Sequence, residues 1–382
     1  MREYLVVFGV AVGVTYLLAS VARQLAVHLG AVAAVRDRDV HALPTPYFGG
    51  PAMLGGLLAA SLVAERLPFL GSADDGVFRD VRAVLVGGVV ICLVGVVDDL
   101  FELDALSKFA GQILAGIVVV ALGVQFVYLP LPQTYIGLDQ AQAVIVTVLL
   151  IVGTANAVNF VDGLDGLASG IVAIGAVAFF SYAFVLAVVN GETRAIAAAL
   201  LTIALAGVCV GILPHNFYPA RMFIGDSGSM LIGLVIACSS ISLTGQFPPT
   251  SLAEGVDGAE ASLLPALLPV LLPFLILLVP FVDLGLAVVR RTRAGRSPFS
   301  PDKMHIHHRL LEIGHSHRMA VLLMYAVAGL VAFGTVVVSL FSGWQSFVGF
   351  GALVVLTAAA IFLLPRLDAR VAAADPGDDV AT

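Results

Sequence analysis

Two adjacent aspartates, Asp98 and Asp99, follow an apolar stretch directly in the sequence GVVDDLFELDALSKFAGQ, with Asp104 and Lys108 a few residues further on. Adjacent carboxylates repel each other unless a cation neutralises them. A hard divalent cation such as Mg2+ takes oxygen ligands and commonly binds through one or two carboxylates together with substrate phosphates. Taken alone, the pair could equally be an acidic helix end in water. The choice between a metal site and a helix end therefore depends on which other residues lie close to it in the fold.

A second set of polar residues, Asn156, Asn159, Asp162 and Asp165, repeats every three residues in NAVNFVDGLDGLASG. Most of these side chains would share one face of a helix if that helix continues to Gly163. The glycines of the segment also permit a break in the helix and a close approach of backbone to a ligand. Amide and carboxylate groups at this density favour a binding site over an ordinary helix end.

A third segment, HNFYPARMFIGDSGS, contains Asn216, Phe223 and Asp226. Asp226 and Ser227 stand where the next apolar run begins, so an ordinary N-cap is one interpretation of the acidic group. A ligand for a bound cation is the other. Phe223 could be a platform for a flat base, although a single phenylalanine near a membrane is usually a packing residue.

A fourth segment, RRTRAGRSPFSPDKMHIHHRLL, is cationic and rich in histidine. The spacing of HIHH does not place two histidines at i and i+4 on one helix face, as a zinc site would require. Arginine forks and imidazole donors instead match the geometry of phosphate oxygens. The alternative, a basic membrane anchor, explains the arginines but not the aspartate or the histidines. The candidate residues are Arg291, Asp302, His305, His307, His308 and Arg309.

Long apolar runs separate these segments. Of the 382 residues, 60% are hydrophobic and only 12% are charged, whereas charged residues make up about a quarter of a soluble domain. A membrane span needs about 20 mainly apolar residues, and about eleven runs qualify. They are 4–24, 47–67, 81–98, 107–124, 142–160, 166–190, 195–213, 228–244, 264–289, 319–340 and 345–364. We therefore expect an all-α integral membrane protein with one polytopic domain over residues 1–364 and a polar, disordered cytoplasmic tail over 365–382.

The basic residues predict how the chain faces. Basic residues near the ends of spans are retained in the cytoplasm. With the N-terminus outside and the C-terminus inside, 14 of the 19 lysines and arginines fall on the cytoplasmic side. The chemically suggestive residues then fall almost entirely in five inside loops, 36–51, 98–108, 159–166, 214–228 and 290–318. Polar groups at membrane depth are costly and usually functional, so we expect one site at the cytoplasmic face.

Other features add detail. Four prolines in the ninth run, Pro265, Pro269, Pro273 and Pro280, predict a bent helix. The three cysteines lie inside apolar runs and indicate neither disulfides nor a metal cluster. The net charge of −7 gives no reason to expect nucleic acid as a partner.

Taken together, DDLFELD, NAVNFVDGLDGLA, FIGDSGS and SPFSPDKMHIHHRLL, in this order and on one membrane face, resemble the polyprenyl-phosphate N-acetylhexosamine-1-phosphate transferase family. The resemblance covers nearly the whole chain from about residue 36 to the tenth run. Within the family, the HIHHR form is similar to the bacterial branch that uses UDP-N-acetylglucosamine (UDP-GlcNAc) and undecaprenyl or decaprenyl phosphate. The phospho-N-acetylmuramoyl-pentapeptide transferases usually have consecutive histidines instead.

The resemblance implies roles for individual residues. It makes Asp98 the residue that deprotonates or positions the lipid phosphate, with Asp99 supporting the metal and Asp226 ligating Mg2+, for which Mn2+ could substitute. Lys108 and His41 are implied at the lipid phosphate, although a basic residue that often precedes this histidine in the family is a valine here. The implied nucleotide-sugar site consists of Asn156, Asn159, Asp162, Asp165, Asn216, Phe223, Asp302, His305, His307, His308, Arg309 and Arg291.

The implied reaction transfers GlcNAc-1-phosphate from UDP-GlcNAc to a polyprenyl phosphate and releases UMP, as the first membrane step of a cell-envelope polysaccharide. The lipid phosphate attacks directly, or an aspartyl-phosphate intermediate forms first. Transfer of phospho-N-acetylmuramoyl pentapeptide is an alternative. An ion-coupled transporter is another, since carboxylates near spans are typical of transporters, but their sites lie near the bilayer midplane. A homodimer is compatible with the family and has no signature in the sequence.

Overall fold

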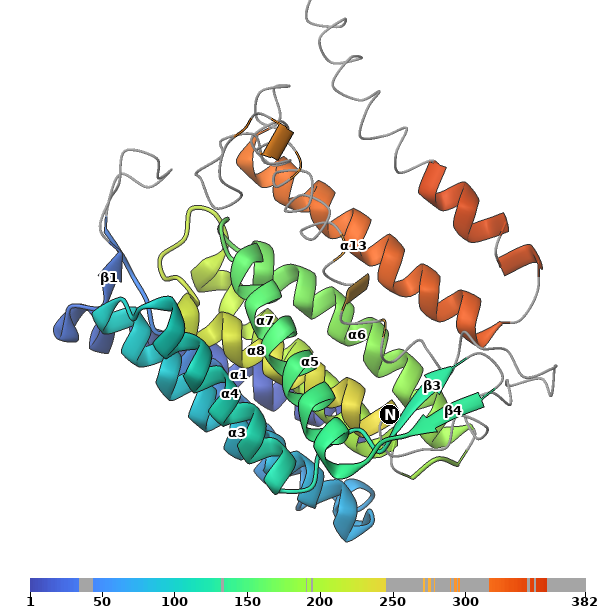
Figure 1. Cartoon of the computed structure of the whole chain (residues 1–382). Helices are drawn as coiled ribbons and strands as arrows, with labels where there is room; N and C mark the ends of the chain where they lie inside the picture. The colour runs from blue at the N-terminus through green and yellow to red at the C-terminus, as the bar shows by residue number, and fades with distance from the viewer. Residues whose placement is uncertain are drawn as a thin grey trace, which may run out of the picture.

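The computed structural model describes residues 1–33, 44–131, 134–189, 191–193, 195–244, 316–341, 344–346 and 348–355, with scattered residues between 271 and 295. Over these residues the chain is mostly helical (Figure 1). The helices are α1 (Arg2–Leu29), α2 (Gly49–Ala64), α3 (Asp75–Phe101), α4 (Ala105–Ala121), α5 (Gln140–Val161), α6 (Leu167–Val188), α7 (Ala195–Asn216), α8 (Gly225–Thr244) and α13 (His317–Leu340), with a short 3-10 helix, η1 (Leu70–Ser72).

Seven of the described helices, α1, α3, α5, α6, α7, α8 and α13, are long and apolar enough to cross a membrane. The helices α2 and α4 are apolar but shorter, at 16 and 17 residues. The chain is therefore a helical integral membrane protein, as the composition predicts. The predicted ninth run, with its four prolines, lies outside the described residues, and the count of eleven spans stays a prediction.

Two small antiparallel sheets interrupt the helices and were not predicted from the sequence. In one, β1 (Val32–Ala33) pairs with β2 (Thr45–Pro46). In the other, β3 (Tyr128–Leu131) pairs with β4 (Thr134–Gly137). Strands of two to four residues are too short for an alternating pattern of apolar and polar residues to reveal them.

Helix α8 lies at the centre of the bundle. Its apolar stretch is fully buried, and it packs against α3, α5 and α7. Small residues at helix contacts let backbones approach closely. Gly95 of α3 is one of them, because a Cβ at this position would lie 2.3 Å from Cα of Ser227 in α8. The close packing of α3 on the first turn of α8 brings together two of the sequence segments predicted to form the site.

The ends of four helices meet at one end of the bundle. Helices α3 and α5 finish there, and α4 and α8 begin there. A three-residue connection turns α3 into α4, and Asp104 caps the new helix by accepting hydrogen bonds from the backbone N–H groups of Leu106 and Ser107, each at 3.0 Å. The polar residues at these helix ends therefore share one region, although up to 128 positions separate them in the chain.

Candidate active site

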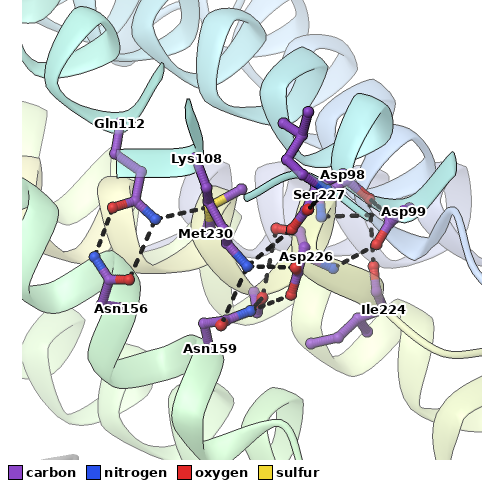
Figure 2. A network of polar contacts seen from close by, with 12 residues as sticks. Asp98, Asp99, Lys108, Gln112, Asn156, Asn159, Ile224, Asp226, Ser227 and Met230 are labelled. Carbon is purple, nitrogen blue, oxygen red and sulfur yellow. Dashed lines mark hydrogen bonds and ion pairs between the residues drawn. The ribbon is translucent and has the colours of Figure 1, made fainter. Parts of the chain in front are cut away.

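Lys108 lies at the centre of the acidic cluster (Figure 2). Its Nζ atom is 2.9 Å from Oδ2 of Asp98 and 3.5 Å from Oδ1 of Asn159. It also forms an ion pair with Oδ2 of Asp226. Helices α3, α5 and α8 thus each contribute an oxygen atom to one ammonium group, which α4 supplies. The arrangement is a cation position lined by oxygen atoms from three helices.

Asp226 lies in the first turn of α8, where the helix dipole favours negative charge. Its Oδ1 accepts a hydrogen bond from Nδ2 of Asn159, and the same nitrogen donates to Oγ of Ser229 at 2.9 Å. The side chain of Asp226 is still 31% exposed. A ligand can therefore reach this carboxylate from outside the bundle.

Asp98 is held on both of its oxygen atoms. Its Oδ1 accepts a hydrogen bond from the backbone N–H of Leu103 at 2.8 Å, while Oδ2 faces Lys108. Only 7% of the side chain is exposed. A carboxylate removed from water in this way needs a paired charge and hydrogen bonds to remain ionised, and both are present.

Asp99 has a different environment from its neighbour, because it caps the N-terminus of α8. Its Oδ1 accepts from the backbone N–H of Asp226 at 2.8 Å. Its Oδ2 accepts from the hydroxyl of Ser227 at 2.7 Å and from the backbone N–H of Ser227 at 3.3 Å. Gly225 has a φ of 69°, and a Cβ there would lie 2.6 Å from Oδ2 of Asp99. The helix cap is therefore Asp99 rather than Asp226, and the metal-supporting role of Asp99 stays a prediction.

Helix α5 ends at Val161, one residue beyond the predicted run 142–160, and it does not continue to Gly163. Glycine is a poor helix former because its backbone has more freedom to lose, and residues 163–166 form turns instead. Asn159 therefore projects from the helix itself, whereas Asp162 lies at its C-cap.

Asp162 is partly buried beside other acidic groups. Burial, followed by repulsion from the carboxylates of Asp226, Asp99 and Asp165, raises the pKa of Asp162 well above its ordinary value. Burial makes the larger contribution to the raised pKa, and the negative charge of the neighbouring carboxylates adds to it. A bound cation would relieve this repulsion.

Asp165 and Asn216 are buried and hold the loop between α7 and α8. Oδ2 of Asp165 accepts from the backbone N–H of Ala220 at 2.9 Å. Nδ2 of Asn216 donates to the carbonyl of Met222 at 3.2 Å, and its Oδ1 accepts from Ser169 at 3.0 Å. These contacts position the segment that leads to Asp226, and the predicted contacts of both residues with a nucleotide sugar stay predictions.

Asn156 lies one turn below Asn159 and faces the interior of the bundle. Its Nδ2 donates to Oε1 of Gln112 at 2.6 Å and to the carbonyl of Val152 at 2.8 Å. Gln112 was missed in the sequence, although a signal for it exists. It is a polar residue four positions after Lys108, and therefore on the same helix face, in an otherwise apolar run.

Phe223 joins the segment before α8 to the residues that lead into α2, a few positions after His41. Its backbone N–H donates to the carbonyl of Pro46 at 2.9 Å, and its carbonyl accepts from the N–H of Gly49 at 3.2 Å. Its ring centroid is 5.9 Å from that of Tyr47. Residues 46–49, which follow His41 in the sequence, therefore lie beside the approach to Asp226.

Helix α13 supplies two contacts that sequence reasoning missed. The hydroxyl of Tyr325 donates to the carbonyl of Gly166, and Nε of Arg318 donates to the carbonyl of Tyr218 at 3.3 Å. Both acceptors belong to segments that flank the site. No sequence signal marks Tyr325, because a tyrosine in an apolar run is usually a packing residue.

The remaining predicted site residues lie outside the described residues. They are His41, Arg291, Asp302, His305, His307, His308 and Arg309.

The described side chains fit Mg2+ better than a transition metal. Among the residues that the structure describes, His, Cys, Asp and Glu side chains form no group of three or more that could hold a metal ion. Mg2+ needs only one or two carboxylates, because waters and substrate phosphates complete its coordination. Asp226, with the amide of Asn159 beside it, offers such a donor set, and the ammonium of Lys108 shows that positive charge is accommodated there.

The fold and the site together define a helical membrane protein with an acidic, lysine-containing site at one end of its bundle. A model of glycosyl transferase family 4 matches residues 81–244, the region that contains Asp98, Lys108, Asn159 and Asp226.

Relatives match over nearly the whole chain. The decaprenyl-phosphate N-acetylglucosaminephosphotransferase of Mycobacterium tuberculosis is 47% identical over 338 residues, which cover 87% of this chain and 82% of the relative. The protein of the same name from Mycolicibacterium smegmatis is 45% identical over 371 residues, 96% of this chain and 89% of the relative. A probable undecaprenyl-phosphate N-acetylglucosaminyl 1-phosphate transferase of Bacillus subtilis is 32% identical over 349 residues, which cover 91% of this chain and 88% of the relative. The chain belongs to glycosyl transferase family 4, and its predicted place among the polyprenyl-phosphate N-acetylhexosamine-1-phosphate transferases is confirmed.

Proposed function

We propose that this protein transfers GlcNAc-1-phosphate from UDP-GlcNAc to a polyprenyl phosphate, in the first membrane step of a cell-envelope polysaccharide. The names of its relatives support the reaction and the lipid acceptor. The observation that carries the proposal is the convergence of Asp98, Asn159 and Asp226 on one cation position. Both substrates are phosphorylated, so a site that holds cations beside an accessible carboxylate suits their chemistry.

The reaction exchanges one phosphorus–oxygen bond for another. An oxygen of the lipid phosphate attacks the β-phosphorus of UDP-GlcNAc, and the bond from that phosphorus to the oxygen of UMP breaks. The bond between the sugar and its phosphate is untouched, so the anomeric configuration is retained. Since both reactants are anionic, the main demands on the protein are neutralisation of charge and in-line placement.

The residues of the site divide these tasks. Asp226 and Asn159 would hold Mg2+, which when bound would neutralise the charge of the diphosphate. Lys108 binds the lipid phosphate, and Asp98 holds Lys108 in place. The second pKa of a phosphate monoester is about 6, so the nucleophile is largely ionised at neutral pH. Asp98 therefore orients the nucleophile more than it deprotonates it.

The proposed setting is the cytoplasmic face of the plasma membrane, with eleven spans and the N-terminus outside. The distribution of lysines and arginines supports this orientation. With that orientation, α3 and α5 finish inside and α4 and α8 begin inside. All four helix ends at the site then face the compartment that contains nucleotide sugars.

A substrate panel tests the proposal. The full chain, purified in detergent, is given decaprenyl or undecaprenyl phosphate and one UDP-sugar at a time, with Mg2+ or with EDTA, and UMP and lipid-linked product are measured. We expect both products from UDP-GlcNAc, only when lipid phosphate and Mg2+ are present. Product from UDP-N-acetylmuramoyl pentapeptide and none from UDP-GlcNAc would assign the chain to the other branch of the family.

The same preparation separates direct transfer from a two-step route. Without lipid acceptor, direct transfer releases no UMP. A burst of UMP equal to the amount of enzyme, with the sugar phosphate left on the protein, would instead show an aspartyl-phosphate intermediate.

A further inference from the structure

Helices α4, α5 and α8 contact one another at the site through two layers of side chains. The charged layer consists of Lys108, Asn159 and Asp226. The second layer, which we call the amide layer, consists of the amides of Gln112 and Asn156 and the thioether of Met230. Each of these residues lies three or four positions from a residue of the charged layer on the same helix, α4, α5 or α8. A spacing of three or four residues places side chains on the same helix face about one turn apart. The amide layer therefore lies about one turn farther from the helix ends than the charged layer, and Figure 2 shows the two groups next to each other.

The amide layer is connected throughout. Nδ2 of Asn156 donates to Oε1 of Gln112 at 2.6 Å, and Nε2 of Gln112 donates back to Oδ1 of Asn156 at 3.3 Å. Nε2 of Gln112 also donates to Sδ of Met230 at 3.0 Å. The two amides thus form a reciprocal pair between α4 and α5, and the sulfur ties α8 to it.

Gln112 is fully buried, with no exposed surface. An amide removed from water costs free energy unless its donors and acceptors are satisfied. A one-residue slip of α4 along α5 moves the side chains by about 1.5 Å. Such a slip would break the reciprocal pair and leave the buried amide of Gln112 without its partner on α5. Apolar side chains at the same positions would tolerate such a slip much better, because hydrophobic contact is not directional.

We propose that Gln112 and Asn156 are positioning residues that set the register of α4 and α5, so that Lys108 and Asn159 meet at Asp226. The cation position depends on such positioning. Oxygen atoms of Asp98, Asn159 and Asp226 must remain close together although they belong to separate helices. Mutual repulsion of the two carboxylates opposes their approach. The amide layer fixes the geometry about one helix turn away from the cation position. This inference rests on the proposed function, because it concerns the same cation position.

The test compares four variants of the full chain with the wild type in detergent. Gln112→Leu breaks the pair, and Gln112→Leu with Asn156→Leu removes both polar groups. Gln112→Asn with Asn156→Gln exchanges the two side chains and keeps an amide pair. The matched control is Gln125→Leu, because Gln125 and Gln140 form another reciprocal amide pair, at 3.3 and 3.2 Å, beside the far end of α5.

Each protein is titrated with Mn2+, with binding followed by electron paramagnetic resonance, and its unfolding temperature and Mg2+-dependent transfer are measured. Loss of a residue that orients the metal ligands without touching the metal typically weakens metal binding by about 10- to 100-fold. We expect weakening on the order of tenfold for Gln112→Leu. We expect the double-leucine variant to regain the unfolding temperature but not the affinity, and the exchanged pair to regain both. Gln125→Leu should bind Mn2+ as the wild type does.

A structural role alone gives a different pattern. Recovery of both affinity and unfolding temperature in the double-leucine variant would overturn the proposal, as would wild-type affinity in Gln112→Leu. A folded exchange variant that binds as weakly as Gln112→Leu would contradict it too. Failure of the proposed function is distinguishable, because then the wild type itself produces no lipid-linked GlcNAc, whatever the variants bind.

Discussion

Lys108 allows two carboxylates from different helices to lie close together. It pairs with Asp98 and Asp226 and is largely buried, with 18% of its side chain exposed. Removing one partner from a buried ion pair leaves an uncompensated charge, which costs more than an exposed pair would. The pairings of this one side chain are therefore the most sensitive feature of the site.

We expect Asp98→Asn to lower turnover by on the order of 100- to 1000-fold, a typical effect of removing a group that positions or stabilises reacting charge. The asparagine can still accept the hydrogen bond from Leu103, but it no longer holds the ammonium of Lys108 by charge. Release of UMP in the presence of lipid phosphate measures the effect. Asp104→Asn is the control, since asparagine is as good an N-cap as aspartate and Asp104 faces solvent.

Full turnover in Asp98→Asn would contradict the role proposed for this residue. A low turnover in both variants would point instead to a general sensitivity of the connection between α3 and α4.

The raised pKa of Asp162 predicts a pH dependence of stability. The folded state holds the proton of Asp162 to a higher pH than the unfolded chain, in which the pKa is about 3.9. The stability contributed by this group is thus present below about pH 4 and is lost as the pH rises through the raised folded value. We expect Asp162→Asn to be more stable than the wild type in EDTA at neutral pH, with a difference that disappears in acid.

Thermal unfolding at several pH values measures this difference, and Mg2+ provides a second comparison. If a cation binds in the cluster, Mg2+ should narrow the gap between the two proteins at neutral pH. Equal unfolding temperatures of the two proteins from acid to neutral pH in EDTA would show that the pKa of Asp162 is not raised in the folded state.

At the scale of elements, the contact between α3 and α8 limits what the site tolerates. A methyl group at Gly95 would lie 2.3 Å from Cα and 2.4 Å from the backbone nitrogen of Ser227, and backbone cannot move aside as a flexible side chain can. Overpacking of this kind typically costs about 1–3 kcal/mol. Because Ser227 also donates to Asp99, displacement would disturb the cap of α8 and the position of Asp226.

We therefore expect Gly95→Ala to lower both the unfolding temperature and transferase activity. Gly153→Ala is the matched control, since no atom lies within 4 Å of its added Cβ and alanine favours a helix by up to about 1 kcal/mol. Thermal unfolding and UMP release measure both variants. If the Gly95→Ala protein were as active and as stable as the Gly153→Ala protein, the close contact between Gly95 and Ser227 would be refuted.

Most described helices could be predicted from the sequence, but their ends could not. The predicted runs 166–190 and 195–213 correspond to α6 (Leu167–Val188) and α7 (Ala195–Asn216), because apolar length alone decides such helices. The predicted run 81–98 begins six residues after α3 does, since polar residues at the membrane boundary continue a helix without contributing to its hydropathy. By contrast, the predicted run 142–160 agrees with α5 (Gln140–Val161) to within two residues at each end.

At the scale of the whole molecule, the two ends of α3 should face opposite sides of the membrane. The helix spans 27 residues, or about 40 Å at 1.5 Å per residue, enough to cross the bilayer. Ser72 precedes it and Ala105 follows it, and both are exposed. The native cysteines are buried, so a new cysteine at either position should be the accessible one.

We expect an impermeant maleimide to label Ser72→Cys in intact cells and Ala105→Cys only after the membrane is opened. This result would place Asp98, Lys108 and Asp226 at the cytoplasmic face. Labelling of Ala105→Cys in intact cells would reverse the proposed orientation and move the site to the outer face.

The sequence alone determined that this is a helical membrane protein, because apolar length is a local property of the chain. The resemblance of four motifs to the polyprenyl-phosphate transferases indicated the family. The grouping of Asp98, Asp99 and Asp226 was also predictable, since the spans place their segments on one side.

Only the tertiary structure decided which partner each side chain takes. Asp98 binds Lys108 while its neighbour Asp99 caps α8, and Asn156 pairs with Gln112 rather than facing the charged layer. Adjacent aspartates, or asparagines three residues apart, have the same chemistry in the sequence. Their roles diverge because each points toward a different neighbouring helix, and the packing of distant helices is not encoded by spacing along one segment.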